Sequence, residues 1–421
     1  MAEKRDMLDD LIDIQQDWEK VSNPFGDIAG QLVDPSKAHV FNPADYKGRP
    51  RANTVYCSRV AAGRPDVCGR CLEVCPVDAI EIGEKTLKVN DNCRECGLCM
   101  SVCPTEAFQL PKHMSKQLYD RIARIASAYE QCYVTCTRAL GRYPKDNEVV
   151  LPCVGLLTPE LWFALLVDYD NISVYLPVGV CDRCQTTTGE EVYVDHIGTA
   201  EQWSGYSVGL EVDEGAMTHE LTRAYKRGQF VSNLARTGSR ALMAGSPALL
   251  GARAVAERIK RHTQKLNDMQ RTLEDAVGGK TSQNRRHVLT QSRKMLLSTI
   301  QESPVLATVL GCRVPQCNSS LCTMCGDCVR ACSLHVCDLD ASGHVSVEPA
   351  YCVGCGACAA VCESGALTMV PADPADLVVP DPNAAKAAEQ RAMVQKAKEE
   401  GRAKISKYLD ALEHLGETDD K

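Results

Sequence analysis

The chain has 421 residues, of which 44% are hydrophobic and 5% aromatic, with a net charge of −8 and 24 cysteines. This length predicts two to four domains, and the scarcity of aromatic residues favours small modules that are held together by metal ligation. The sequence contains no nucleic-acid-binding module, signal peptide or membrane-spanning apolar run, so we expect a cytoplasmic protein with reduced thiols and no nucleic-acid partner.

Residues 1–50 are predicted to form an N-terminal docking arm. A short amphipathic helix carries Met7, Leu11, Ile14 and Trp18, and proline and glycine interrupt the segment that follows it. An arm with apolar positions and no core of its own is expected to pack on another surface.

The first of two cysteine blocks lies at 51–112. It holds two sets of four cysteines, Cys57, Cys68, Cys71 and Cys75, then Cys93, Cys96, Cys99 and Cys103. The second set has spacings of two, two and three residues. The first set has ten residues between its first two members, which we interpret as an insertion. Short strands are expected between the sets, at 80–82 and 87–89.

This spacing is explained by the chemistry of a four-iron cluster. Three thiolates in a C-x2-C-x2-C turn can bind three iron atoms of one cluster, while the fourth cysteine binds the neighbouring cluster. We expect that fourth cysteine to open a helix. One 4Fe-4S cluster is then predicted on Cys57, Cys68, Cys71 and Cys103, and another on Cys93, Cys96, Cys99 and Cys75.

Residues 113–195 are predicted to form a small α/β domain. Helices are expected at 118–130 and 159–167, and parallel strands at 131–135, 148–152 and 172–178. Ligands gather beyond the carboxyl ends of parallel strands, so the cysteines at these ends are expected to converge. They are Cys132, Cys136, Cys153, Cys181 and Cys184.

Several short strings in this domain carry a family resemblance. They are Tyr143-Pro144, Pro152-Cys153-Val154-Gly155, Pro159-Glu160, Gly179-Val180-Cys181-Asp182-Arg183-Cys184 and Gly189. Together they resemble the delta subunit of methyl-viologen-reducing hydrogenase, although the cysteine spacing differs. The resemblance implies a 2Fe-2S cluster, which we place on Cys136, Cys153, Cys181 and Cys184. Cys132 falls inside the apolar strand and is left without a role. A structural zinc site and a vestigial thiol domain are the alternatives.

Residues 196–300 are predicted to be a basic helical connector. Helices are expected at 218–234, 248–276 and 285–300, with a break at Gly278-Gly279. Between Thr222 and Lys294, 16 basic residues stand against four acidic ones. Such a segment could dock an acidic subunit or an anionic membrane surface, or it could be a solvated face that offsets the charge of reduced clusters.

The second cysteine block lies at 301–371, and it repeats the pattern of the first. One cluster is predicted on Cys322, Cys325, Cys328 and Cys362, and its neighbour on Cys352, Cys355, Cys358 and Cys332. Strands are expected near 336 and at 344–347. Both blocks resemble bacterial dicluster ferredoxins, although Ser333 and Glu363 replace the usual proline here. Cys312, Cys317 and Cys337 are left without a role.

Residues 372–421 are predicted to be a proline-rich linker and a C-terminal helix. The linker carries Pro374, Pro380 and Pro382, and the helix is expected at 384–414. Apolar positions are sparse on this helix, so we expect it to bind a partner.

Together these elements predict an α+β protein in which two dicluster ferredoxin-like modules flank a small α/β domain and a helical connector. No catalytic constellation is found, so we expect a non-catalytic electron-transfer subunit. Four 4Fe-4S clusters and a 2Fe-2S cluster would relay single electrons within a hetero-oligomeric redox complex. The expected partner is a flavoprotein, such as a heterodisulfide-reductase-like one, a hydrogenase, or a formate-dehydrogenase-like subunit. A thiol or sulfur reductase that uses the middle cysteines, and a zinc-binding scaffold, are the alternatives.

Overall fold

The computed structural model describes residues 41–222, 264, 266–340 and 342–379. Residues 1–40 of the predicted N-terminal arm, the predicted helix at 384–414 and much of the basic connector lie outside these residues. From Pro43 onward, the described residues belong to one contact unit.

The first module consists of short elements around two β-ladders. In chain order they are η1 (Pro43–Tyr46), β1 (Arg51–Ala52), η2 (Thr54–Tyr56), α3 (Ser58–Ala62), α4 (Arg70–Glu73), β2 (Ile80–Ile82), β3 (Leu87–Val89), α5 (Leu98–Ser101) and β4 (Phe108–Gln109). Strand β1 pairs antiparallel with β4, and β2 pairs antiparallel with β3. The strands predicted at 80–82 and 87–89 are confirmed. Helix α3 occupies the predicted insertion between Cys57 and Cys68.

The second module repeats this order. Its elements are β9 (Arg313–Cys317), α13 (Asp327–Ala331), β10 (Cys337–Leu339), β11 (Val345–Val347), α14 (Ala357–Ala360) and β12 (Leu367–Pro371). Strand β9 pairs antiparallel with β12, and β10 with β11. The same succession of strand, helix, hairpin, helix and strand in both modules confirms the internal repeat.

The prediction that the fourth cysteine of each set opens a helix is wrong. Each short helix ends before that cysteine, and a turn and then a strand follow it. Three residues past the cysteine, the backbone enters the left-handed region, which ends helical hydrogen bonding. The four residues in this conformation are Asp78, Glu106, His335 and Gly365, with φ of 49°, 51°, 56° and 64°.

The middle of the chain forms a parallel sheet with helices packed on it. Its elements are η3 (Pro111–His113), α6 (Ser115–Ala128), β5 (Cys132–Cys136), α7 (Thr137–Leu140), β6 (Glu148–Leu151), η4 (Val154–Leu156), α8 (Pro159–Asp168), β7 (Ile172–Tyr175), α9 (Gly189–Ser204), β8 (Gly209–Glu211) and η5 (Glu214–Ala216). The strand order is β6-β5-β7-β8, and every neighbouring pair is parallel. Every residue of β5, β6 and β7 is buried, as expected for a parallel sheet that is covered on both faces. The predicted parallel strands are confirmed, but the sheet continues past residue 195 to β8.

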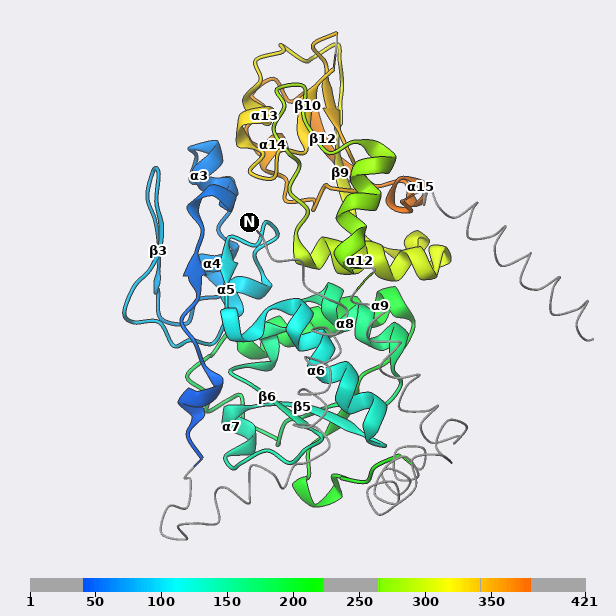
Figure 1. The fold of residues 1–421 in the computed structure, drawn as a ribbon. Coiled ribbons are helices and arrows are strands. Elements are labelled where there is room, and N and C mark those ends of the chain that lie inside the picture. The colour runs from blue at the N-terminus through cyan, green and yellow to red at the C-terminus, as the bar shows by residue number, and fades with distance from the viewer. Residues whose placement is uncertain (1–40, 223–263, 265, 341, 380–421) are drawn as a thin grey trace, which may run out of the picture. The chain divides into compact units, whose positions relative to one another are not determined.

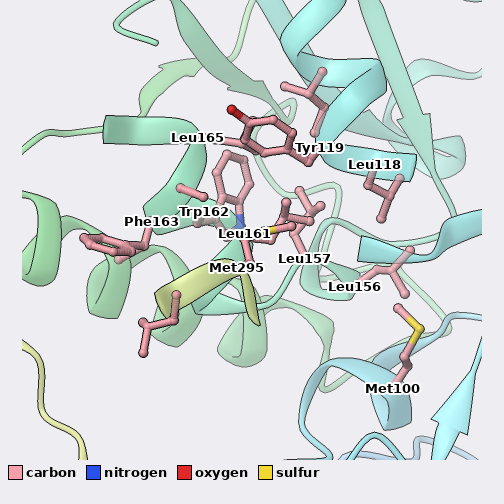
Figure 2. Close-up of a cluster of buried hydrophobic side chains, with 14 of the residues drawn as sticks. Met100, Leu118, Tyr119, Leu156, Leu157, Leu161, Trp162, Phe163, Leu165 and Met295 are labelled. Carbon is pink, nitrogen blue, oxygen red and sulfur yellow. The ribbon is translucent and has the colours of Figure 1, made fainter. Parts of the chain in front are cut away.

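Helix α8 lies at the centre of the hydrophobic core. It packs against α6, α9 and α12 (Gln291–Glu302), which lie around it in Figure 1. Trp162 is fully buried, and Figure 2 shows it close to Tyr119 of α6 and Met295 of α12. Phe163 meets Trp203 of α9 edge to face, with ring centroids 5.9 Å apart. The core is therefore shared between the α/β domain and the segment that leads into the second module.

The connector differs from its prediction at two helix starts. Residues 218–222 of the helix predicted at 218–234 are not helical, since Leu221 forms an isolated antiparallel bridge with Tyr129, and the rest of that helix lies outside the described residues. Residues 266–277 are helical, and the break at Gly278 is confirmed. The helix predicted from 285 begins only at Gln291, because the Thr290 side chain accepts a hydrogen bond from the Arg293 amide and caps it. After it come η7 (Pro304–Val309) and, at the other end of the second module, α15 (Pro374–Leu377). Leu377 and Val379 of the predicted linker are buried.

Glu106 of the first module caps the N-terminus of α12. Its two carboxylate oxygens accept hydrogen bonds from the backbone amides of Gln291 and Ser292, at 2.8 and 2.7 Å. A carboxylate at a helix N-terminus satisfies free amides and interacts favourably with the helix dipole. The Glu106→Ala variant is therefore expected to lower the free energy of unfolding by about 1–2 kcal/mol, measured by chemical denaturation under anaerobic conditions. Alanine at Glu84, in the exposed turn between β2 and β3, is the control, and an equal loss there would contradict the assignment.

Candidate iron–sulfur sites

Three of the four cysteine loops have the same backbone conformation. The residue before the second cysteine and the residue after it are both left-handed, so the loop curls around its thiols. The pairs are Glu95 and Gly97, Met324 and Gly326, and Gly354 and Gly356. The fourth loop differs, since Gly69 has φ of −131°, and its first thiol, Cys57, comes from the residue before α3.

The turn after the fourth cysteine directs a backbone amide at that thiol. Ala79 donates to Cys75 Sγ at 3.2 Å, and Ala107 donates to Cys103 Sγ at 3.3 Å. Val336 donates to Cys332 Sγ at 3.3 Å. Because an amide hydrogen bond stabilises an anionic thiolate, these turns are suited to hold thiolates at a metal cluster. Proline is not required for this geometry, since Ser333 follows Cys332.

The first module brings together the two sets predicted from spacing. Burial, and then the nearby thiols of Cys103, Cys68 and Cys57, raise the pKa of Cys71 to about 12. We call these four residues the Cys57 set. Burial and the thiols of Cys96, Cys93, Cys71 and Cys75 raise the pKa of Cys99. Cys93, Cys96, Cys99 and Cys75 form the Cys93 set, which lines one cavity. Cys71 of the Cys57 set lies near Cys99 of the Cys93 set, so the two sets are neighbours.

The second module brings together one set closely and the other more loosely. Cys332, Cys352, Cys355 and Cys358, the Cys352 set, line one cavity, and burial and the other three thiols raise the pKa of Cys358. Cys322, Cys325, Cys328 and Cys362 form the Cys322 set. In this set, Cys362 lies near Cys328, and Cys325 is exposed.

Two of the three cysteines without a predicted role in the second module lie beside predicted ligands. Cys337 is buried beside Cys328, and the interaction of the two thiols lowers the pKa of Cys328 and raises that of Cys337. Cys317 lies beside Cys322, and burial and this neighbour raise its pKa. Cys312 accepts a hydrogen bond from the buried Arg293 at 3.2 Å.

Four of the five cysteines in the α/β domain converge. Cys136, Cys153, Cys181 and Cys184, the middle set, line one cavity beyond the carboxyl ends of β5 and β6. Gly189 lies so close that a side-chain carbon there would be 2.8 Å from Cys153 Sγ. Cys132 is buried at the opposite end of β5 and does not line this cavity, and burial raises its pKa to about 12.

The sets lie next to one another in a definite order. Burial and the thiols of Cys136, Cys96 and Cys184 raise the pKa of Cys153, so the middle set adjoins the Cys93 set. Helix α5 packs against η4 at this junction, and Thr188 donates to the Val74 carbonyl oxygen at 2.6 Å. At the other side of the first module, Ser58 Oγ lies 3.9 Å from Cys355 Sγ. The first module therefore lies between the other two groups of thiols, although the α/β domain stands between the modules in the sequence.

Among the described residues, no three His, Cys, Asp or Glu side chains lie close enough to bind one metal ion, and no helix could span a membrane. All thiolates of a zinc site bind the same ion, at about 2.3 Å. In a 4Fe-4S cluster each thiolate binds a different iron atom, and in a 2Fe-2S cluster two thiolates bind each iron atom.

The fold and the thiol sets define ferredoxin-type iron–sulfur modules. Residues 66–107 match the family model of the 4Fe-4S dicluster domain, and residues 345–368 match that of the 4Fe-4S binding domain. No curated protein and no solved structure matches the chain. The ferredoxin resemblance of both blocks is thus confirmed. Neither match includes residues 113–195, so the resemblance to the hydrogenase delta subunit stays a prediction.

Sequence reasoning missed several polar residues around these sites. Ser58, Thr105 and Glu106 follow ligand cysteines closely in the sequence, yet nothing in their spacing indicates a contact with another module. Arg293 is 5% exposed, and it donates to the carbonyl oxygens of Ala350 and Pro349, just before Cys352. Only the tertiary structure shows these contacts.

Proposed function

We propose that this chain relays single electrons through five iron–sulfur clusters in a fixed order. The order is the middle set, the Cys93 set, the Cys57 set, the Cys352 set and the Cys322 set. The observation that supports the proposal is that groups of neighbouring sets lie close at the junctions. Cys153 lies near Cys96, Cys99 lies near Cys71, and both Cys68 and the Ser58 hydroxyl lie near Cys355. When bound, the clusters supply one-electron redox chemistry at potentials that the protein sets.

Three features of these sets fit such a cofactor. Three loops curl with the same left-handed residues, and amides point at the fourth thiols, as a cluster with anionic ligands requires. The cavities of the Cys93, Cys352 and middle sets are lined mainly by apolar side chains and thiols. Such surroundings exclude water and so help to set the reduction potential.

Electrons enter and leave at the first and last sets of this order, the middle set and the Cys322 set. Of the 24 cysteines, all of which are described, only Cys325 of the Cys322 set is exposed. Leu321 and Met324 beside it are 51% and 55% exposed. At the other end, Val178 near Cys181 is 84% exposed. Partner subunits at these ends, such as a flavoprotein, a hydrogenase or a formate-dehydrogenase-like subunit, would complete the redox complex.

Metal and sulfide analysis after anaerobic purification tests the relay. We expect about 18 iron atoms per chain, from four 4Fe-4S clusters and one 2Fe-2S cluster, and electron paramagnetic resonance (EPR) signals of both cluster types after reduction. Fewer than about eight irons, or zinc in their place, would contradict the relay and favour a zinc scaffold.

The reductase alternative has its own discriminating variant. Replacing Cys181 by serine is expected to remove the signal of one cluster. Loss of an activity on a disulfide or sulfur substrate, with every cluster signal kept, would favour a reductase. Burial, and then Glu190, raise the pKa of Cys181 to about 11, whereas a reactive thiol needs a lowered pKa.

A further inference from the structure

Ser58 connects a cluster loop of one module to a cluster thiol of the other. It directly follows Cys57 and is the first residue of α3, and it is only 5% exposed. Its Oγ lies 3.9 Å from Cys355 Sγ, although 297 positions separate the two residues in the sequence. A hydroxyl can donate to a thiolate at this distance only weakly, but a buried donor faces little competition from water.

Thr105 gives a second, independent contact at the same junction. Its Oγ1 lies 3.6 Å from Cys103 Sγ, in its own module. The residue is 3% exposed and also lines the cavity of the Cys352 set. Cys57 and Cys103 both belong to the Cys57 set, so two ligand segments of that set form part of the neighbouring site.

The packing of the helices holds this junction in place. Helix α3 contacts both α13 and α14, the two short helices of the second module that precede Cys332 and Cys362 (Figure 1). Cys68 of the Cys57 set also lies near Cys355. Ser58 belongs to α3 of the first module. Its hydroxyl therefore comes close to Cys355 only because α3 packs against the second module.

We propose that Ser58 is a positioning residue for electron transfer between the modules: its hydroxyl donates to the Cys355 thiolate and raises the reduction potential of the Cys352 set. The inference rests on the proposed relay. A donor hydrogen bond to a cluster sulfur stabilises the more negative, reduced state, so reduction becomes more favourable. One electron leaves the Cys57 set and one electron arrives at the Cys352 set, and no proton or ligand has to move.

Ser364 offers a matched comparison. Its Oγ lies 3.5 Å from Cys362 Sγ within the same module. Both serines place a hydroxyl near a predicted ligand, but the thiols belong to different sets. The two alanine variants should therefore shift the midpoints of different clusters.

The test is a redox titration of the full chain, followed by EPR, for Ser58→Ala, Ser58→Gly, Ser58→Thr and Ser364→Ala. Ser58→Ala is expected to make reduction of one cluster roughly threefold less favourable, a fall of about 28 mV in its midpoint. Ser58→Thr keeps the hydroxyl and should keep the wild-type midpoint. Ser364→Ala should shift a different signal and leave the first one unchanged.

Three results would overturn the inference. One is a Ser58→Ala protein with full iron content and no shifted midpoint, which leaves the relay itself intact. Another is a shift of the same signal by Ser58→Ala and Ser364→Ala. The third is loss of iron in both Ser58→Ala and Ser58→Gly, since Ser58 would then be required for assembly. Low iron in the wild-type protein would instead count against the relay.

Discussion

The Cys103→Ser variant is expected to lose the cluster of the Cys57 set and to keep that of the Cys93 set. In the sequence, Cys103 stands just after Cys93, Cys96 and Cys99, so simple proximity would predict the opposite. In the structure, its thiol lies beside Cys71 and Cys68, because α5 and the turn after it direct the thiol to the other set. Iron should fall by about four atoms per chain.

Stability should fall together with the iron. The module has short strands and helices, so metal ligation supplies much of its folding free energy. Iron analysis, EPR and thermal unfolding under anaerobic conditions measure the three effects. Cys75→Ser is the matched variant, since Cys75 belongs to the Cys93 set, and it should remove the other cluster. Loss of the same EPR signal in both variants would contradict the crossed ligation.

The second large effect is expected at the middle set. Cys153→Ser should remove about two iron atoms per chain and the signal of a 2Fe-2S cluster, because Cys153 lines the cavity with the other three thiols. Since Cys153 also adjoins Cys96, this variant removes the end of the relay and should leave the four 4Fe-4S signals.

Cys132→Ser is the control for this experiment. Cys132 is as deeply buried as its neighbours on β5 but lies outside the cavity, so iron content should not change. A loss of iron in Cys132→Ser, or bound zinc that disappears in Cys153→Ser, would contradict the 2Fe-2S assignment.

Much of the fold was predictable where local patterns are strong. The apolar runs of β5, β6 and β7 and the hairpin of β2 and β3 were located to within a few residues. Strand β8 was missed, because Gly209–Glu211 is short and not apolar, and becomes a strand only by pairing with β7. The start at Gln291 was missed because a threonine cap outweighs the helical pattern before it.

The candidate sites, like the fold, were predictable only where they depend on local sequence. The grouping of thiols within each module follows from the spacing of the cysteines, since the loops are local structures. The order of the sets does not follow from spacing, because it depends on how α3, α5 and η4 pack against distant elements. Ser58 and Glu106 contact residues 297 and 185 positions away, and no local pattern indicates such contacts.

The distance in sequence between Ser58 and Cys355 also has a consequence for biosynthesis. At a rate of about 5–20 residues per second, roughly 15–60 s separate the synthesis of these residues. Throughout that interval, the face of the first module that the second will cover stays open to solvent and to oxidants. Clusters that are inserted after release of the finished chain would therefore be covered by the second module at once. Clusters that are inserted into the first module during translation would stay open to oxidants until the second module is made.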